Sequence, residues 1–289
     1  MLRMPSGFWE QVVADGLKVP EDRSLVEMTE DLTRMLGDTD PEIRDGIAFP
    51  TMATWIDEGV YDDLLVGLGD GMCHGLDIGL GDVESDTVFR RSFSALILTE
   101  CIDRTTRAAL GGPDVVLRWG DRIMSWYSRE QDLRGFVPGK GWAHAVAHGA
   151  DALGALARSP VMGRLELTVI LDVIADRLLT PTDAFFVCGE GDRLAFATMH
   201  LLRRDVLGID VLEPWVARLA TGAVGRGSIH RNPYLVAGNV QSYLRSLHLQ
   251  LSLNTASSGH PAVRSDLLLV LADTLRSTNR AYFAAPSAH

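Results

Sequence analysis

The sequence has little cysteine and no long apolar run. Its three cysteines lie far apart without Cys-x-x-Cys spacing, which argues against a disulfide framework and favours a reducing compartment. The apolar stretch 263–275 is interrupted by Arg264, Asp266 and Asp273, so it falls short of the roughly 20 apolar residues of a transmembrane helix. The first ten residues lack the charged start and apolar run of a secretory signal. These absences predict a cytoplasmic protein that does not enter a membrane.

Positive charge is also scarce. The 289 residues include 27 Lys and Arg against 38 Asp and Glu, which gives a formal net charge of -11. A uniformly acidic chain repels phosphate backbones, so nucleic acid is not expected as a partner. Apolar residues make up 46% of the chain, which is enough to bury a large core. We therefore expect one domain over 1–289, with a disordered tail at 284–289.

Strand-like alternation is scarce, whereas helical periodicity runs through most of the chain. Asp40-Pro41 is typical of an N-cap followed by proline at the first helical position, and Pro50 is expected to bend or split the helix that follows. Further helices are predicted at 7–17, 23–36, 60–78, 86–109, 114–131, 142–157, 163–179, 190–206, 211–224, 234–254 and 262–283. Short Gly, Pro and Asp turns between them make consecutive helices antiparallel neighbours. The fold class is therefore predicted to be all-α.

The turn at 36–45 resembles the junction between the two helices of a HEAT-type repeat. Such repeats often close one helix, turn at Asp-Pro and open the next helix with a small apolar pattern. Roughly a dozen helices joined by short turns favour the same architecture. The predicted fold is a HEAT-like α-α superhelix of antiparallel helices.

The segment Glu130–Asp151 carries the strongest chemical pattern in the chain. In a helix that advances about 100° per residue, His148 lies ~40° to one side of His144 and Asp151 lies ~20° to the other. The flanks of this helix are Ala and Gly, so neighbouring helices can pack closely there. We expect the stripe formed by His144, His148 and Asp151 to face a cleft.

The loop before this helix carries charges of both signs. It delivers them to the N-terminal end of the helix, where free backbone N–H groups attract anions. The candidate ligand-binding residues of the loop are Glu130, Asp132, Arg134, Lys140 and Trp142. Arg134 and Lys140 are expected to hold the anionic part of a small molecule.

A fainter parallel occurs in the glycine-rich stretch near residue 70. Asp70 and His74 lie four residues apart, on one side of a predicted helix. They form a second wall of the pocket in one interpretation. In the other interpretation, the glycines around them simply allow two helices to pack closely.

Several of these residues also resemble a known family. The matching pieces are Glu130, Asp132, Arg134-Gly135-Phe136, Lys140-Gly141-Trp142, His144, His148 and Asp151, with Arg90-Arg91-Ser92-Phe93-Ser94 and Gly189-Glu190 alongside. They resemble a bacterial family of HEAT-like helical-repeat proteins that is known only as a domain of unknown function. The resemblance spans most of the chain. It implies a helical array and brings no activity with it.

The histidine stripe admits three interpretations. His144, His148 and Asp151 could supply three ligands to a divalent metal such as zinc, although Ala145 stands where a zincin has its glutamate. They could instead perform acid–base chemistry or bind an anion without a metal. They could also be structural, with both imidazoles hydrogen-bonded to neighbouring helices.

The predicted function follows from this stripe. We expect a small-molecule-binding protein or an enzyme in which His144, His148 and Asp151 are the catalytic candidates. The alternative is a non-enzymatic helical-repeat scaffold that binds a peptide or protein. The balance leans only slightly toward an enzyme and leaves the reaction class open.

Overall fold

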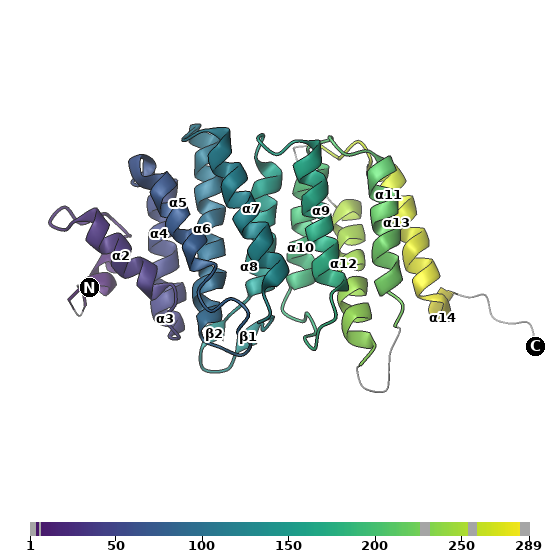
Figure 1. The fold of residues 1–289 in the computed structure, drawn as a ribbon, viewed down its shortest axis with the longest axis horizontal. Coiled ribbons are helices and arrows are strands. Elements are labelled where there is room, and N and C mark those ends of the chain that lie inside the picture. Colours follow the sequence, from purple (N-terminus) through teal and green to yellow (C-terminus); the bar gives the residue numbers. More distant parts are fainter. Residues whose placement is uncertain (1–3, 6, 226–231, 254–258, 284–289) are drawn as a thin grey trace, which may run out of the picture. The chain divides into compact units, whose positions relative to one another are not determined.

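A computed structural model of the protein describes residues 4–5, 7–225, 232–253 and 259–283, and these residues are mostly helical (Figure 1). The tail 284–289, which was expected to be disordered, lies outside the described residues. The chain divides into two compact units, Met1–Val161 and Met162–His289, and each is described by itself. The expectation of one domain over the whole chain stays a prediction.

Unit 1 holds all the residues of the predicted site. Its elements are α1 (Phe8–Ala14), α2 (Leu25–Met35), α3 (Pro41–Ile43), the π-helix η1 (Arg44–Ala48), α4 (Phe49–Asp57), the 3₁₀ turn η2 (Asp62–Leu64), α5 (Leu65–Gly75), α6 (Thr87–Ala108), α7 (Pro113–Arg129), β1 (Phe136–Val137), β2 (Gly141–Trp142) and α8 (Ala145–Arg158). Helix α6 contacts α4 and α8 in one layer, and α5 contacts α7 in a second layer. Across the two layers, α5 packs on α6, and α7 packs on both α6 and α8.

The sequence of α7 shows why this helix forms and which side it buries. Proline occupies its first position, where no intrahelical N–H is needed, after an extended Gly112. Its buried residues Val116, Trp119, Ile123 and Trp126 recur every three or four positions, which is the spacing of one helix face. Trp119 lies against Gly69 of α5, where a Cβ atom would collide with the indole. Close packing of α5 on α7 therefore accounts for this glycine.

The helix predicted to bend at Pro50 is divided in three. Asp40 caps α3 by accepting a hydrogen bond from the Glu42 amide. The chain then widens into the π-helix η1, and the amide of Phe49 donates to the carbonyl of Arg44, five residues earlier. Pro50 follows at the start of α4, where its missing N–H costs little.

Unit 2 repeats the layered arrangement. It contains α9 (Arg164–Leu179), α10 (Glu190–Leu202), α11 (Ile209–Gly222), α12 (Tyr234–Leu253), α13 (Arg264–Thr278) and α14 (Arg280–Phe283). Helix α11 contacts both α9 and α13, and α10 contacts α12. The polar side chain of Asn239 is almost fully buried, and it accepts from the amide of Phe186 (2.8 Å) and donates to the carbonyl of Ala184 (3.1 Å), which fixes the loop between α9 and α10.

The helix predicted over 142–157 begins three residues later, at Ala145. A short hairpin precedes it, with Phe136 opposite Trp142 and Val137 opposite Gly141. Its turn contains Pro138 and Gly139, and the amide of Lys140 donates to the carbonyl of Val137 at 3.0 Å. Gly139 has φ 76°, the left-handed conformation that a Pro-Gly type II turn requires. Trp142 therefore belongs to a strand, and helical periodicity could not place it.

The three cysteines are all free thiols, as their spacing predicted. Within the described ranges, every helix is too short or too polar to cross a lipid bilayer.

Candidate functional site

His144 occupies the N-cap of α8 with an unusual backbone. Its φ of 50° and ψ of 31° are left-handed, a conformation that costs roughly 1–2 kcal/mol for a residue with a Cβ atom. The His144 amide donates to the carbonyl of Arg134 at 3.1 Å, and the Ala143 amide donates to Gly135 at 2.8 Å. The loop therefore holds His144 in this conformation from both sides. As a consequence, its side chain leaves the backbone in a direction that a helical residue could not give it.

The imidazole of His144 lies within a row of aromatic rings. It stacks on the indole of Trp142, with ring centroids 4.3 Å apart and planes inclined by 24°. The ring of His148 meets it edge-on at 5.6 Å, and Phe93 of α6 meets His148 edge-on at 5.1 Å. The rings of Phe136 and Trp142 meet at a steep angle of 75°, with their centroids 5.0 Å apart. The row runs from an exposed end at Phe136 and Trp142 to a buried end at Phe93.

His148 is anchored by Ser92, which is fully buried on α6. The Ser92 hydroxyl donates to the carbonyl of Ala143, so it accepts from Nδ1 of His148, 2.6 Å away. This arrangement places the proton of the neutral imidazole on Nδ1 and leaves Nε2 as the basic nitrogen. Ser92 is not prepared as a nucleophile, because its proton is directed at a backbone carbonyl. Its role is to orient His148 and to tie α6 to the start of α8.

Glu130 was predicted to bind a ligand, and the structure pairs it with Arg91. Both side chains are buried, and two hydrogen bonds of 2.6 and 2.9 Å join them. Glu130 also accepts from the Trp126 indole (3.0 Å) and from the amides of Gln131 and Asp132 (3.0 and 2.9 Å). Arg91 also donates to two carbonyls in the turn after α5 and to a hydroxyl at the start of α6. The carboxylate is therefore fully used in holding the loop onto α6 and α7.

The other three charged residues of the loop are paired as well. Arg134 makes a bidentate pair with Asp132, with hydrogen bonds of 2.8 and 2.6 Å. The hydrogen bond with Asp132 raises the pKa of Arg134 above its usual value. Lys140 binds both carboxylate oxygens of Asp86, at 2.6 and 2.7 Å, on the protein surface. The two cations expected to hold an anion are thus neutralised by carboxylates of the protein.

Arg44 holds the hairpin in place, although no pattern in the sequence singles it out. Its fully buried guanidinium lies over the rings of Phe89 and Phe93, 4.2 and 5.0 Å from their centroids. It donates to the carbonyl of Lys140 (2.8 Å) and to the carboxylate of Asp45 (2.8 Å). Burial lowers the pKa of Arg44, and the carboxylate opposes that shift. The π-helix thus anchors the strand that carries Trp142.

Asp70 and His74 lie on α5 and bind locally. Asp70 accepts from the Trp119 indole at 2.9 Å and from Arg118 at 3.1 Å. Burial alone would raise the pKa of Asp70, but these two hydrogen bonds outweigh burial and lower it. The exposed His74 ring contacts the Asp70 carbonyl at 2.9 Å through Nδ1. These contacts tie α5 to α7 and satisfy the carboxylate of Asp70.

The structure therefore brings together part of the predicted set. His144, His148 and Trp142 form one contiguous group, and Asp151 follows one turn after His148, half-buried on α8. Sequence reasoning missed Ser92 and Arg44 as members of the site. The only signal for Ser92 was its place in the piece Arg90–Ser94, and Arg44 lies 96 residues from its partner Lys140.

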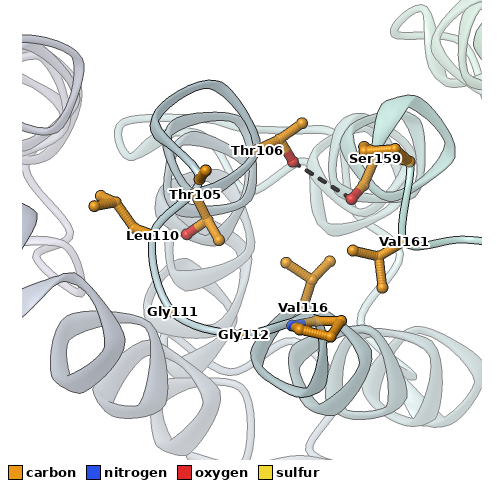
Figure 2. Close-up of a pocket in the computed structure, with 11 residues that line it drawn as sticks. Thr105, Thr106, Leu110, Gly111, Gly112, Val116, Ser159 and Val161 are labelled. Atoms are coloured by element: carbon orange, nitrogen blue, oxygen red, sulfur yellow. Dashed lines mark hydrogen bonds between the residues drawn. The ribbon is translucent and has the colours of Figure 1, made fainter.

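A cavity of about 240 Å³ lies elsewhere in unit 1, where the turn between α6 and α7 meets the end of α8. Figure 2 shows its wall, including the hydrogen bond of 3.4 Å from Thr106 to Ser159. The described residues that line it are Thr, Ser, Ala, Leu, Gly, Pro and Val, and none of them titrates near neutral pH. This hollow contains no group for acid–base chemistry, unlike the end of α8.

The molecule is thus an all-α protein in which a polar loop and a strained histidine meet at a helix start. Residues 76–249, more than half of the chain, match the family described as "Protein of unknown function (DUF2785)", and the chain belongs to that family. The matched region includes the whole loop and α8. No curated protein and no solved structure matches the chain.

Proposed function

We propose that the protein binds a small molecule at the start of α8, with His144 as the side chain that contacts it. The observation that carries this proposal is the left-handed backbone of His144, which places its imidazole on Trp142. Strained residues of this kind concentrate at functional sites, where the surrounding structure holds them against their preference. An enzymatic form of the proposal uses His144 or His148 for proton transfer, with Ser92 orienting His148.

The ion pairs of Arg134 and Lys140 argue against an anionic ligand. An anionic molecule held by Arg134 and Lys140 would have to displace Asp132 and Asp86 from them. The imidazoles are the better candidates for polar contact, because a histidine ring can both donate and accept hydrogen bonds and His144 stacks on the partly exposed Trp142. The proposal therefore rests on His144 and His148 and does not need an anion.

A metal-assisted form would use His144, His148 and Asp151 as ligands of zinc or another divalent ion. The hydrogen bond between Nδ1 of His148 and Ser92 is of the kind that orients metal-binding histidines, which coordinate through the opposite nitrogen. Metal content and small-molecule content can be measured on the same protein sample, so one preparation tests both forms.

The test is to purify the natively folded protein, release its bound small molecules by denaturation, and identify them by mass spectrometry. His144→Asn is the informative variant, because asparagine tolerates the left-handed backbone and lacks the imidazole. His74→Asn, at an exposed histidine of α5, is the matched control. A molecule retained by wild type and the control but lost from His144→Asn supports the proposal. Equal retention in all three proteins would contradict the proposal that His144 contacts the molecule.

The same samples are analysed for metals. Stoichiometric zinc in wild type and in His74→Asn, with its loss in His144→Asn, would support the metal-assisted form. Zinc content that does not depend on His144 would exclude this ligand set.

A peptide-binding scaffold is the second candidate. We infer that the stacked helix pairs are HEAT-like repeats, because helices two apart in the sequence contact each other in both units, as α6 does with α4 and α8, and α11 with α9 and α13. In unit 2, a hollow of about 230 Å³ between α9 and α11 is lined in part by Leu171, Pro214 and Trp215. Leu165 and Val169 are exposed one turn apart on α9. An apolar helix face beside a hollow is a common way to hold a peptide.

A further inference from the structure

The hollow of about 240 Å³ lies at the opposite end of α8 from His144. Helix α8 has 14 residues, so roughly 20 Å separates the two places. Thr105, Val116 and Ser159 line the hollow and are almost fully buried, whereas the residues of the α6–α7 turn that line it, such as Gly111, are exposed. The hollow therefore has a buried floor and a mouth that opens to solvent.

The lining of the hollow is uncharged and mostly apolar. Its side chains are those of Thr, Ser, Ala, Leu, Pro and Val, with glycines between them. The hydroxyl of Thr106 is already used, because it donates to Ser159 at 3.4 Å. Water in a cavity needs roughly two to four polar partners, so this lining holds water poorly and an apolar molecule gains free energy by displacing it. A charged molecule would lose its hydration and meet no opposite charge in the lining.

One polar group in this wall lacks a partner. The buried hydroxyl of Thr105 has no hydrogen-bond partner among the described residues, although leaving a buried hydroxyl unpaired costs stability. Figure 2 shows Thr105 on the other side of the hollow from Val161. Threonine in a helix adopts two χ1 rotamers, and a rotation between them exchanges the positions of its hydroxyl and methyl groups. A molecule in the hollow is therefore well placed to supply the missing hydrogen bond.

The volume limits the size of that molecule. An apolar cavity of about 150 Å³ holds benzene, so a hollow of about 240 Å³ has room for an aromatic ring with one substituent. We propose that the hollow binds a small uncharged molecule with an apolar ring or chain and one alcohol or carbonyl group, which bonds to Thr105. This site is separate from His144 and does not depend on the function proposed there.

Four probes of similar size test the proposal: benzyl alcohol, toluene, which lacks the polar group, the anion benzoate and the cation benzylammonium. Binding to the full-length protein is followed by the NMR signals of the Thr105 and Val116 methyl groups. Nuclear Overhauser effects from the probe to these methyl groups place it in the hollow. We expect benzyl alcohol to bind about two- to tenfold more tightly than toluene, which is the worth of one hydrogen bond, and both charged probes to bind more weakly than either.

Thr105→Val is the informative variant, because valine keeps the shape of threonine and lacks the hydroxyl. Benzyl alcohol and toluene should bind equally well to this variant. Thr99→Val is the matched control, because Thr99 is also buried on α6 but its hydroxyl donates to the carbonyl of Ala95 at 3.1 Å. The control should keep the preference for benzyl alcohol.

The proposal is overturned if no probe binds in the hollow, if a charged probe binds as tightly as benzyl alcohol, or if toluene equals benzyl alcohol in wild type. A preference for benzyl alcohol that persists in Thr105→Val would also overturn it. His144→Asn should leave the binding of all four probes unchanged, and a loss of binding in that variant would contradict the separation of the two sites.

Discussion

Two ion pairs hold the loop before α8, and one of them is buried whereas the other is exposed to solvent. Arg91 and Glu130 are buried, and the carboxylate is shared with an indole and two backbone amides. Lys140 and Asp86 lie at the surface with 40% and 47% of their side chains exposed. In the sequence, Glu130 and Lys140 were equally good candidates to bind a ligand. Burial distinguishes the two residues, because the buried carboxylate of Glu130 already accepts five hydrogen bonds and cannot bind a ligand as well.

The largest expected effect is at the buried pair. Glu130→Gln removes the negative charge and leaves Arg91 charged in a buried site, which typically costs about 3–5 kcal/mol. Urea unfolding followed by circular dichroism measures the loss of stability. Asp86→Asn at the exposed pair is the control and should cost less than about 1 kcal/mol. Equal costs for the two variants would show that the buried and exposed pairs do not differ.

The next largest effect should come from Ser92, which is also buried. Ser92→Ala removes the hydrogen bonds to Ala143 and His148 and is expected to cost about 1–3 kcal/mol in the free energy of unfolding. Ser128→Ala is a fitting control, because that exposed hydroxyl bonds only within its own helix. The Nδ1–H signal of His148 in NMR should also shift in Ser92→Ala. An unchanged signal would mean that Ser92 does not orient the ring.

The left-handed backbone of His144 predicts a smaller effect on stability, which compares two backbone conformations rather than two ion pairs. His144→Gly removes the imidazole and relieves the left-handed strain, whereas His144→Ala keeps the strain. The glycine variant is therefore expected to be more stable than the alanine variant by about 1 kcal/mol. Thermal unfolding of both proteins measures the difference. Greater stability of the alanine variant would rule out the left-handed conformation.

The smallest effect is expected at the exposed pair itself. Lys140→Gln should lower the free energy of unfolding by less than about 1 kcal/mol, and raising the salt concentration should shrink that difference further. The matched measurement on Glu130→Gln should change little with salt, because that site is buried. A strong salt dependence at Glu130 would contradict its burial.

The helices were largely predictable because their signals are local. The predicted ranges 86–109 and 163–179 correspond to α6 at 87–108 and α9 at 164–179. The start of each helix has a local signal, because Asp86 and Gly163 stand at the two N-cap positions. Short connections predicted that consecutive helices lie side by side, and α5 does contact α6 while α7 contacts both α6 and α8.

The candidate site was predictable only in part, because its geometry depends on distant contacts. Helical periodicity placed His144 and His148 on one stripe, but His144 precedes the helix and takes a left-handed backbone from its bonds to Arg134 and Gly135. The partners of the loop charges, Arg91 and Asp86, come from α6 and the residue before it. A local pattern can indicate that a residue carries charge, but it cannot show which residue neutralises that charge.

The five residues of η1 have a consequence for how this chain can vary in length. Winding from Arg44 to Phe49 in a π-helix brings both side chains to the same face, where each contacts Phe93. In an ordinary α-helix, two residues five positions apart point about 140° from each other. Deleting one residue here would restore a regular helix and turn Arg44 away from the hairpin it secures. The number of residues between Asp40 and Pro50 is therefore as constrained as their identity.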